Sequence, residues 1–133
     1  MDFFNDRSLR LLEKAIYAGS LRQRVIANNI ANINTSGFKK SSVVFESVLQ
    51  KTLNTEKIPL ATSDSRHFNS LAMLDELKPS VVEENTTSMR ADGNNVDIEQ
   101  EMVRLAVNNL NFNADVQGLN NRLNLMGLVI NGR

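Results

Sequence analysis

The segment IANNIANINTSGFKK, residues 26–40, marks the place where a helical pattern stops. Ile26, Ile30 and Ile33 recur at the spacing of one face of a helix. Asparagines crowd the same window although Asn is a poor helix former, and a Thr-Ser-Gly run follows. We therefore expect a helix to end here, with Gly37 supplying the left-handed turn that closes it.

A heptad pattern leads into this segment. Apolar residues recur at alternating steps of three and four, and Gly19 and Gln23 are the two breaks. The apolar members are Leu9, Leu12, Ile16, Ile26, Ile30 and Ile33. A repeat of 3.5 residues is typical of a coiled-coil seam. The pattern predicts a helix over residues 3–33, roughly 45 Å long at about 1.5 Å per residue.

The last third of the chain carries a second heptad. Asp97 is a good N-cap, and Gln100 stands three residues later, as in a capping box. The heptad positions are Ile98, Met102, Leu105, Asn109, Phe112, Val116, Leu119, Leu123, Met126 and Ile130. We predict a helix of about 50 Å.

Two features of this second helix bear on its neighbours. Asn109 interrupts the apolar positions, and it either faces water or fixes the helix register from a buried position. A second apolar row, made of Val103, Ala106 and Leu110, would let the helix touch more than one neighbour. Its many Asn residues and two glycines lower its intrinsic helix propensity. We therefore expect this helix to be completed by contacts with other subunits.

The middle of the chain has weaker signals. Residues 43–45 and 81–83 are β-branched or aromatic enough to pair as a small β element. A short helix is expected through Phe45, Val48, Leu49 and Leu53, and one or two helical turns at residues 71–77. The segment ADGNN, residues 91–95, is typical of a turn.

These patterns predict a mainly α fold. Two long terminal helices pack as an antiparallel, coiled-coil-like pair, and a polar, partly extended middle loops out. The expected divisions are an N-terminal helix within residues 1–36, a middle segment over residues 37–94, and a C-terminal helix within residues 95–133. A single helix pair leaves apolar rows uncovered, and such rows usually mark an interface.

Composition excludes several functions. The 133 residues fit one domain. The formal net charge is zero, which argues against nucleic acid as a partner. There is no Cys, so thiolate metal sites and disulfides are excluded. No apolar run approaches the roughly 18 residues of a membrane span, and the N-terminus does not resemble a cleavable secretory signal.

The search for catalytic chemistry finds little. His67 is the only His, and one His without Cys does not build a common zinc site. Asp97, Glu99 and Glu101 cluster at a helix start, where they favour the positive end of the helix dipole. We predict no catalytic residue, no metal ligand and no cofactor.

Two segments resemble bacterial flagellar axial proteins, the rod, hook and hook-associated subunits. ANNIANINTSGFK, residues 27–39, resembles their N-terminal signature, although the family commonly has Pro where Ser36 stands. Residues 92–114 are similar to the C-terminal signature of a short proximal rod subunit, and residues 62–68 resemble the central segment of the family. The matching positions are Asn28, Asn29, Asn32, Thr35, Gly37, Phe38, Gly93, Asn94, Val96, Asp97 and Phe112.

The resemblance implies a structural subunit of the proximal rod. Such a subunit is exported unfolded through the flagellar type III apparatus without a cleaved signal. It then joins a helical tube in the periplasm that transmits torque and conducts later subunits. The implied partners are copies of itself, the rod proteins FlgC, FlgF and FlgG, and the basal adaptor FliE at the membrane ring. The clustered asparagines would then bridge subunits.

Two alternatives stay open from the sequence. Within the family, the alternative is the sister rod protein FlgC. The Gly-Asn-Asn-Val-Asp run at residues 93–97 argues against FlgC. From another class, the alternative is a cytoplasmic coiled-coil secretion chaperone or regulator, which would form a discrete dimer.

Overall fold

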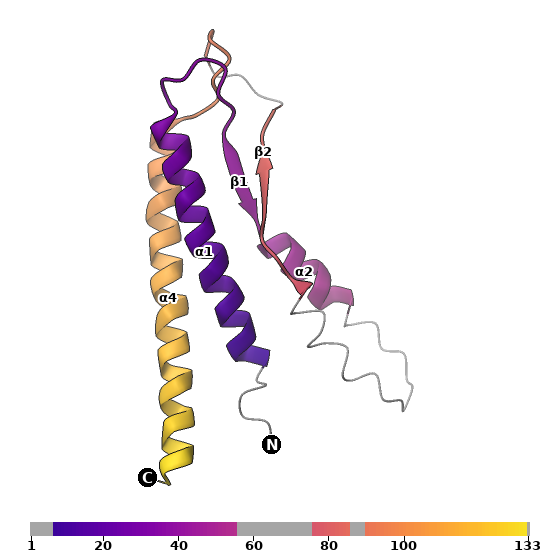
Figure 1. The fold of residues 1–133 in the computed structure, drawn as a ribbon, viewed down its shortest axis with the longest axis vertical. Coiled ribbons are helices and arrows are strands. Elements are labelled where there is room, and N and C mark those ends of the chain that lie inside the picture. Colours follow the sequence, from indigo (N-terminus) through magenta and orange to yellow (C-terminus); the bar gives the residue numbers. More distant parts are fainter. Residues whose placement is uncertain (1–6, 56–75, 86–89, 133) are drawn as a thin grey trace.

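The computed structural model describes residues 7–55, 76–85 and 90–132. The elements are α1 (Arg7–Ala31), β1 (Ser41–Val44), α2 (Glu46–Thr55), β2 (Ser80–Glu83) and α4 (Ile98–Asn131). Helices α1 and α4 run side by side along the long axis, while the strands and α2 stand on one side of this pair (Figure 1). Expectations for residues 3–6 and 62–68, and for most of residues 71–77, lie outside the described residues.

The two terminal helices pack against each other in opposite directions, which confirms the predicted fold class (Figure 1). Small residues set their distance. A Cβ built on Gly19 of α1 would lie 3.1 Å from Cδ2 of Phe112, and one built on Gly118 of α4 would lie 3.3 Å from Cδ2 of Leu12. Gly19, which interrupts the heptad, is therefore a point of close approach between the helices.

The start of α4 agrees with the sequence prediction. The Asp97 side chain accepts hydrogen bonds from the backbone N–H groups of Glu99 at 3.0 Å and Gln100 at 3.3 Å. These bonds satisfy donors that the first helical turn leaves unpaired. The Gln100 side chain does not complete the capping box, because its oxygen accepts from Lys40 Nζ at 3.3 Å.

Strands β1 and β2 form a two-stranded antiparallel sheet, which confirms the predicted β element. The register pairs Ser41 with Glu83 and Val44 with Ser80. Phe45 was expected in the strand but follows it, and it is buried against Ala18 of α1. The hydrophobic core is completed by Leu77, with Ala15, Val48 and Leu49 packed against it.

Buried polar residues are as numerous as buried apolar ones in the described part of the chain. The buried polar residues are Asn29, Lys40, Asn94, Asn95, Glu101 and Asn108. The buried apolar residues are Ala18, Ile26, Val43, Phe45, Leu77 and Val96. Because a buried polar group is costly without a hydrogen-bond partner, the fold depends on how these six side chains are paired.

The side of α4 that meets α1 differs from the heptad drawn from the sequence. Glu101 and Asn108 are buried against α1, whereas Met102 and Asn109, one residue further on, are exposed. Leu105, Phe112, Val116, Leu119 and Met126 are partly buried, and Ile98, Leu123 and Ile130 are exposed. On α1, Ile26 is buried, and Leu9, Leu12, Ile16 and Ile30 are partly buried, as is Ile33 beyond its end. The heptad prediction assigns only apolar residues to the contact between the helices. It therefore misses positions, such as Glu101 and Asn108, that are buried because their side chains form hydrogen bonds.

Candidate functional site

The two segments that resemble family signatures meet at one end of the helix pair. The loop after α1, residues 32–40, lies against the loop before α4, residues 90–97 (Figure 1). We call their contact, together with the Asn29–Ser41–Glu101 cluster beside it, the polar junction. Its members are Asn29, Lys40, Ser41, Asn94, Asn95 and Glu101.

Asn94 binds the turn that follows α1. Its side-chain nitrogen donates toward the carbonyl oxygens of Asn32 at 3.0 Å, Ile33 at 3.1 Å and Thr35 at 2.8 Å. Its side-chain oxygen accepts from the N–H of Val96 at 2.8 Å. Because α1 ends at Ala31, these bonds hold the turn beyond the helix, and they come from a residue about 60 positions away in the sequence.

Asn95 joins the ends of the two strands. Its side-chain oxygen accepts from the N–H of Lys40 at 2.7 Å, and its nitrogen donates to the carbonyl of Glu84 at 2.7 Å. The N–H of Glu84 still donates to the carbonyl of Lys40 at 2.9 Å. The amide of Asn95 therefore bridges the position where the second hydrogen bond of an antiparallel pair would stand.

Asn29 binds the other edge of β1. Its nitrogen donates to the carbonyl of Ser41 at 2.8 Å, and its oxygen accepts from the N–H of Ser41 at 3.0 Å. The same nitrogen lies 3.0 Å from Oε2 of Glu101, which also accepts through Oε1 from Arg104 at 3.0 Å. Asn29 is completely buried, so its hydrogen bonds hold the chain together internally and do not bridge subunits.

Gly37 has the left-handed backbone that the sequence predicts, with a φ of 73°. The expectation that it closes the helix is wrong, because α1 ends at Ala31, six residues before Gly37. Instead, the N–H of Gly37 donates to the carbonyl of Asp92 at 2.9 Å, and Lys39 Nζ donates to the carbonyl of Gly93 at 2.7 Å. The turn at Gly37 therefore presents the loop backbone to the opposite loop.

The remaining motif positions take ordinary local roles. Thr35 donates from its hydroxyl to the Asn32 side chain at 3.2 Å, and Asn32 donates to the carbonyl of Asn28 at 2.8 Å. Phe38 is partly buried and Val96 is buried. Gly93 has a φ of 84° and lies in the turn predicted for residues 91–95.

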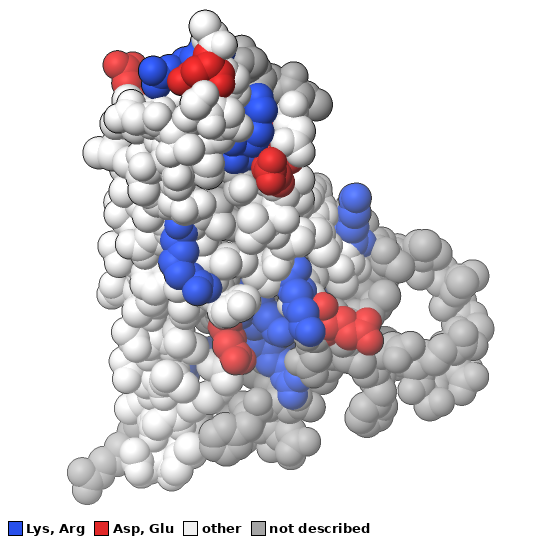
Figure 2. Space-filling model, turned by 45° about the horizontal axis from the view of Figure 1, so that its top comes forward, with Lys and Arg blue, Asp and Glu red and all other residues white. Residues whose placement is uncertain are grey.

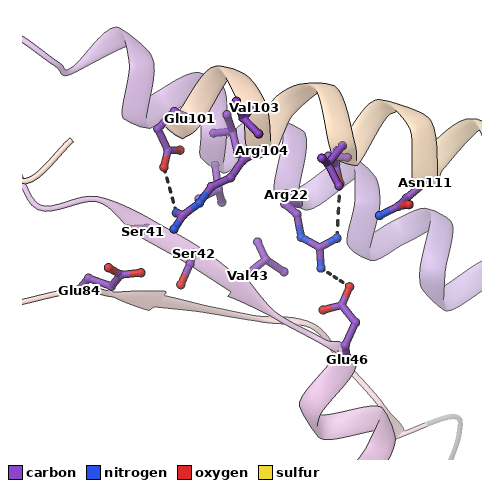
Figure 3. A pocket seen from close by; sticks show the side chains of 14 residues that line it. Arg22, Ser41, Ser42, Val43, Glu46, Glu84, Glu101, Val103, Arg104 and Asn111 are labelled. Carbon is purple, nitrogen blue, oxygen red and sulfur yellow. Dashed lines mark hydrogen bonds and ion pairs between the residues drawn. The ribbon is translucent and has the colours of Figure 1, made fainter. Parts of the chain in front are cut away.

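A groove of about 480 Å³ lies beside the polar junction, between α1, β1 and α4 (Figure 3). Several of its polar side chains are paired with one another. Arg22 lies 2.6 Å from Glu46 and donates to Asn108 at 3.5 Å, and Glu101 pairs with Arg104. The apolar part of the lining comes from Val25, Ile26, Val43, Val103 and Val107.

The carboxyl of Asp115, on α4, has a raised pKa. Burial raises the pKa of Asp115 above its ordinary value of 3.8, Arg22 lowers it, and Glu46 raises it. The net effect disfavours the ionised form in the folded state. The cause is structural, because Asp115 lies partly buried beside Phe112 and Arg22 without a catalytic partner.

Neither a metal-binding cluster nor a membrane-spanning helix occurs among the described residues. Within the described ranges, no group of three acidic or His side chains could hold a metal ion. Among the described helices, none is long and apolar enough to cross a membrane. On the face drawn in Figure 2, basic and acidic side chains are spread over the surface among uncharged ones.

Helix α4 exposes many large apolar side chains. Along the half that packs beside α1 and β1, Met102, Val103, Val107 and Leu110 are at least half exposed, and Leu110 is 70% exposed. Toward its C-terminal end, Leu123, Leu125, Leu128, Val129 and Ile130 are all about half exposed or more. Contiguous apolar surface of this kind marks an interaction site on a soluble protein.

Comparison with known proteins identifies relatives along nearly the whole chain. A family model described as "Flagella basal body rod protein" matches residues 9–39. The flagellar basal body rod protein FlgB of Bacillus subtilis is 33% identical over 125 residues, which cover 94% of each chain. FlgB of Borreliella burgdorferi is 38% identical over 112 residues (80% of this chain and 83% of the relative), and FlgB of Escherichia coli is 27% identical over 126 residues (89% and 88%).

Proposed function

Because this chain belongs to the FlgB family of flagellar basal body rod proteins, we propose that its terminal helices join it to neighbouring subunits in a helical tube. The family role is structural, so the chain is a subunit of the basal body rod and not an enzyme. It therefore assembles with other flagellar rod components. The similarity to FlgB proteins does not favour FlgC or a secretion chaperone.

One observation carries the proposal: α4 has more apolar surface than α1 covers. Helix α4 has 34 residues and α1 has 25. Val103, Val107 and Leu110 are at least half exposed on one side, and Met102 is 54% exposed on another. Helix–helix contacts with neighbouring subunits would bury both sides, as hydrophobic side chains do in coiled coils.

The C-terminal part of α4 supports the same proposal. Five exposed apolar side chains lie between Leu123 and Ile130, and this segment contains no charged residue. Helices that are apolar on several sides are ordinarily buried by other helices. Contacts with adjacent subunits would supply that cover, and Met102, Leu123 and Met126 of the heptad would then serve between chains.

The finer features of the role are proposals on the same basis. The tube transmits torque, conducts exported subunits and lies in the periplasm, and the chain reaches it by type III export without a cleaved signal. The proposed neighbours are copies of the chain, FlgC, FlgF, FlgG and FliE near the membrane ring. The three divisions at residues 1–36, 37–94 and 95–133 would then separate the tube-forming helices from the outer middle segment.

A charge placed on the exposed row of α4 tests the interface. Replacing Leu110 by Asp should leave the circular dichroism spectrum and melting temperature of the purified chain nearly unchanged, because Leu110 is 70% exposed. It should reduce the amount of the chain in isolated basal bodies by about tenfold or more, since a buried unpaired charge is costly. Swimming in soft agar should fall in parallel.

Ser47→Asp is the matched control, because Ser47 is an exposed polar residue of α2 and lies outside the apolar sides of α4. It adds the same charge without opposing apolar burial and should incorporate normally. Normal incorporation of Leu110→Asp would contradict the proposed interface. Equal loss for both variants would attribute the effect to charge alone and would also count against it.

A cross-linking experiment identifies the neighbours. The chain has no Cys, so a single Cys at the exposed position Asn121 would be unique. Mass spectrometry of cross-linked basal bodies should recover Asn121→Cys attached to rod subunits or to the basal adaptor. Recovery only as a cytoplasmic dimer would overturn the proposed tube.

A further inference from the structure

We propose that Asn94 and Asn95 form a latch that completes the N-terminal half of the fold. According to this proposal, the end of α1 and the β1–β2 hairpin reach their native structure only when the loop at residues 92–97 is in place. Below, the latch means the side chains of Asn94 and Asn95 with the backbone groups that they bind. The proposal concerns folding within one chain and does not depend on how the terminal helices assemble.

The turn that follows α1 is held by local bonds and by bonds from the opposite loop. Locally, the Asn32 carbonyl accepts from the Thr35 N–H at 3.0 Å, and the Thr35 carbonyl accepts from the Phe38 N–H at 3.3 Å. The carbonyls of Asn32, Ile33 and Thr35 also accept from Asn94, which is completely buried, and the Ile33 carbonyl accepts from Arg90 as well. Because one intramolecular hydrogen bond contributes about 0.5–1.5 kcal/mol net, loss of the Asn94 amide weakens the native turn.

The end of the β1–β2 pair at Lys40 and Glu84 depends on Asn95 in a similar way. Asn95 is completely buried and binds the N–H of Lys40 and the carbonyl of Glu84. An isolated two-stranded hairpin is marginal in water, and each strand here has only four residues. Without Asn95, this end of the ladder would keep only the bond from the Glu84 N–H to the Lys40 carbonyl.

Backbone contacts between the two loops act in the same direction. The N–H of Gly37 and the hydroxyl of Ser36 both donate to the carbonyl of Asp92, at 2.9 and 3.3 Å. A Cβ on Gly93 would lie 3.7 Å from the Cα of Gly37, so the loops are in van der Waals contact. These partners are separated by more than 50 positions, and the entropy of closing such a loop opposes their meeting.

The loops and the hairpin depend on the latch, whereas the middle of the α1–α4 pair does not. The middle of the α1–α4 pair is held by Gly19, Phe112 and the bond from Asn108 to the Gly19 carbonyl. These contacts lie several helical turns from Asn94. Opening of the latch should therefore release the junction and the hairpin before it separates the helices, as expected for locally cooperative units.

Asn94→Asp in the full chain tests this expectation with little change in shape. The substitution keeps the acceptor for the Val96 N–H but replaces the donor with a carboxylate oxygen facing three carbonyls. In hydrogen exchange with mass spectrometry, peptides from residues 32–44 and 80–85 should exchange at least about tenfold faster. Peptides from residues 10–22 and 105–122 should keep their protection. Asn113→Asp, at an exposed site of α4, should match the unmodified chain everywhere.

Asn95→Ala provides a second, distinct pattern. It should speed exchange in residues 40–44 and 80–85 but leave residues 32–36 protected, because Asn94 still binds the turn that follows α1. Faster exchange at all peptides in either variant would show one indivisible unit and overturn the latch, as would unchanged exchange in both. These readouts use the purified chain, so a failed latch is distinguishable from a failed interface at Leu110.

Discussion

An asparagine side chain carries one carbonyl and one N–H₂ group, the same hydrogen-bonding pair as a peptide group. Asn29 uses both on the N–H and carbonyl of Ser41, as a residue of an added strand would. Asn95 uses both to bridge Lys40 and Glu84. Asp could not donate in this way, which explains why Asn, a poor helix former, occupies the end of α1.

Asn29→Ala should destabilise the purified chain by about 2–3 kcal/mol, because both Ser41 backbone groups lose a buried partner and Glu101 loses one of its two donors. Urea unfolding followed by circular dichroism measures the change. Asn34→Ala, at an exposed site in the following turn, should change stability by less than about 0.5 kcal/mol. Equal effects at the two positions would contradict the role assigned to Asn29.

Asp115 should make stability depend on pH. Because its pKa is raised in the folded state, the folded chain holds its proton more tightly than the unfolded chain, and stability falls as pH rises through that pKa. Asp115→Asn should therefore raise the melting temperature of the chain at pH 7, because the neutral amide avoids the cost of ionising the partly buried carboxyl. The advantage should disappear below the ordinary carboxyl pKa of 3.8. Thermal melts from pH 3 to 7 would show this, and a stabilisation that grew toward acid pH would contradict it.

For the two long helices, the sequence predicts that they exist and run antiparallel better than it predicts which residues of each helix contact the other. Asp97 and its acidic neighbours identify the start of α4, and the isoleucines before Asn32 identify the end of α1 to within a few residues. The contact face is missed, because Asn108 enters it by donating to the carbonyl of Gly19 at 3.0 Å. Residue type alone does not reveal that a backbone carbonyl of the facing helix lies within hydrogen-bonding distance of Asn108.

Glycines on the two helices should respond oppositely to substitution. Gly127→Ala should stabilise the purified chain by up to about 1 kcal/mol, because nothing lies within 4 Å of the new Cβ and Ala is the better helix former. Gly19→Val should destabilise it by about 1–3 kcal/mol, because the new Cβ lies 3.1 Å from Phe112. Ser20→Val, at the next and exposed position, is the control. Urea unfolding would contradict this account if Gly19→Val and Ser20→Val were equally stable.

For the molecule as a whole, local pattern predicted the small sheet and the two helices that frame it. The sequence predicts that residues 43–45 pair with residues 81–83. The register of β1 with β2 confirms this pairing to within a residue or two. The polar junction could not be predicted, because the bonds that bring its two loops and helices together join residues 55, 62 and 72 positions apart. The two signature segments were each recognisable, but their mutual contact is a property of the folded chain.

The composition of the junction has a mechanical consequence. Apolar contacts are non-directional, so two valine-lined helices can slide or rotate slightly at little cost. Hydrogen bonds weaken steeply when their angle changes, and Asn29, Asn94 and Asn95 place several of them in different directions at one joint. The angle between the helix pair and the hairpin is therefore stiff against twisting, while the apolar faces of α4 remain compliant. A subunit built in this way would keep its own shape under load and yield, if at all, where it meets its neighbours.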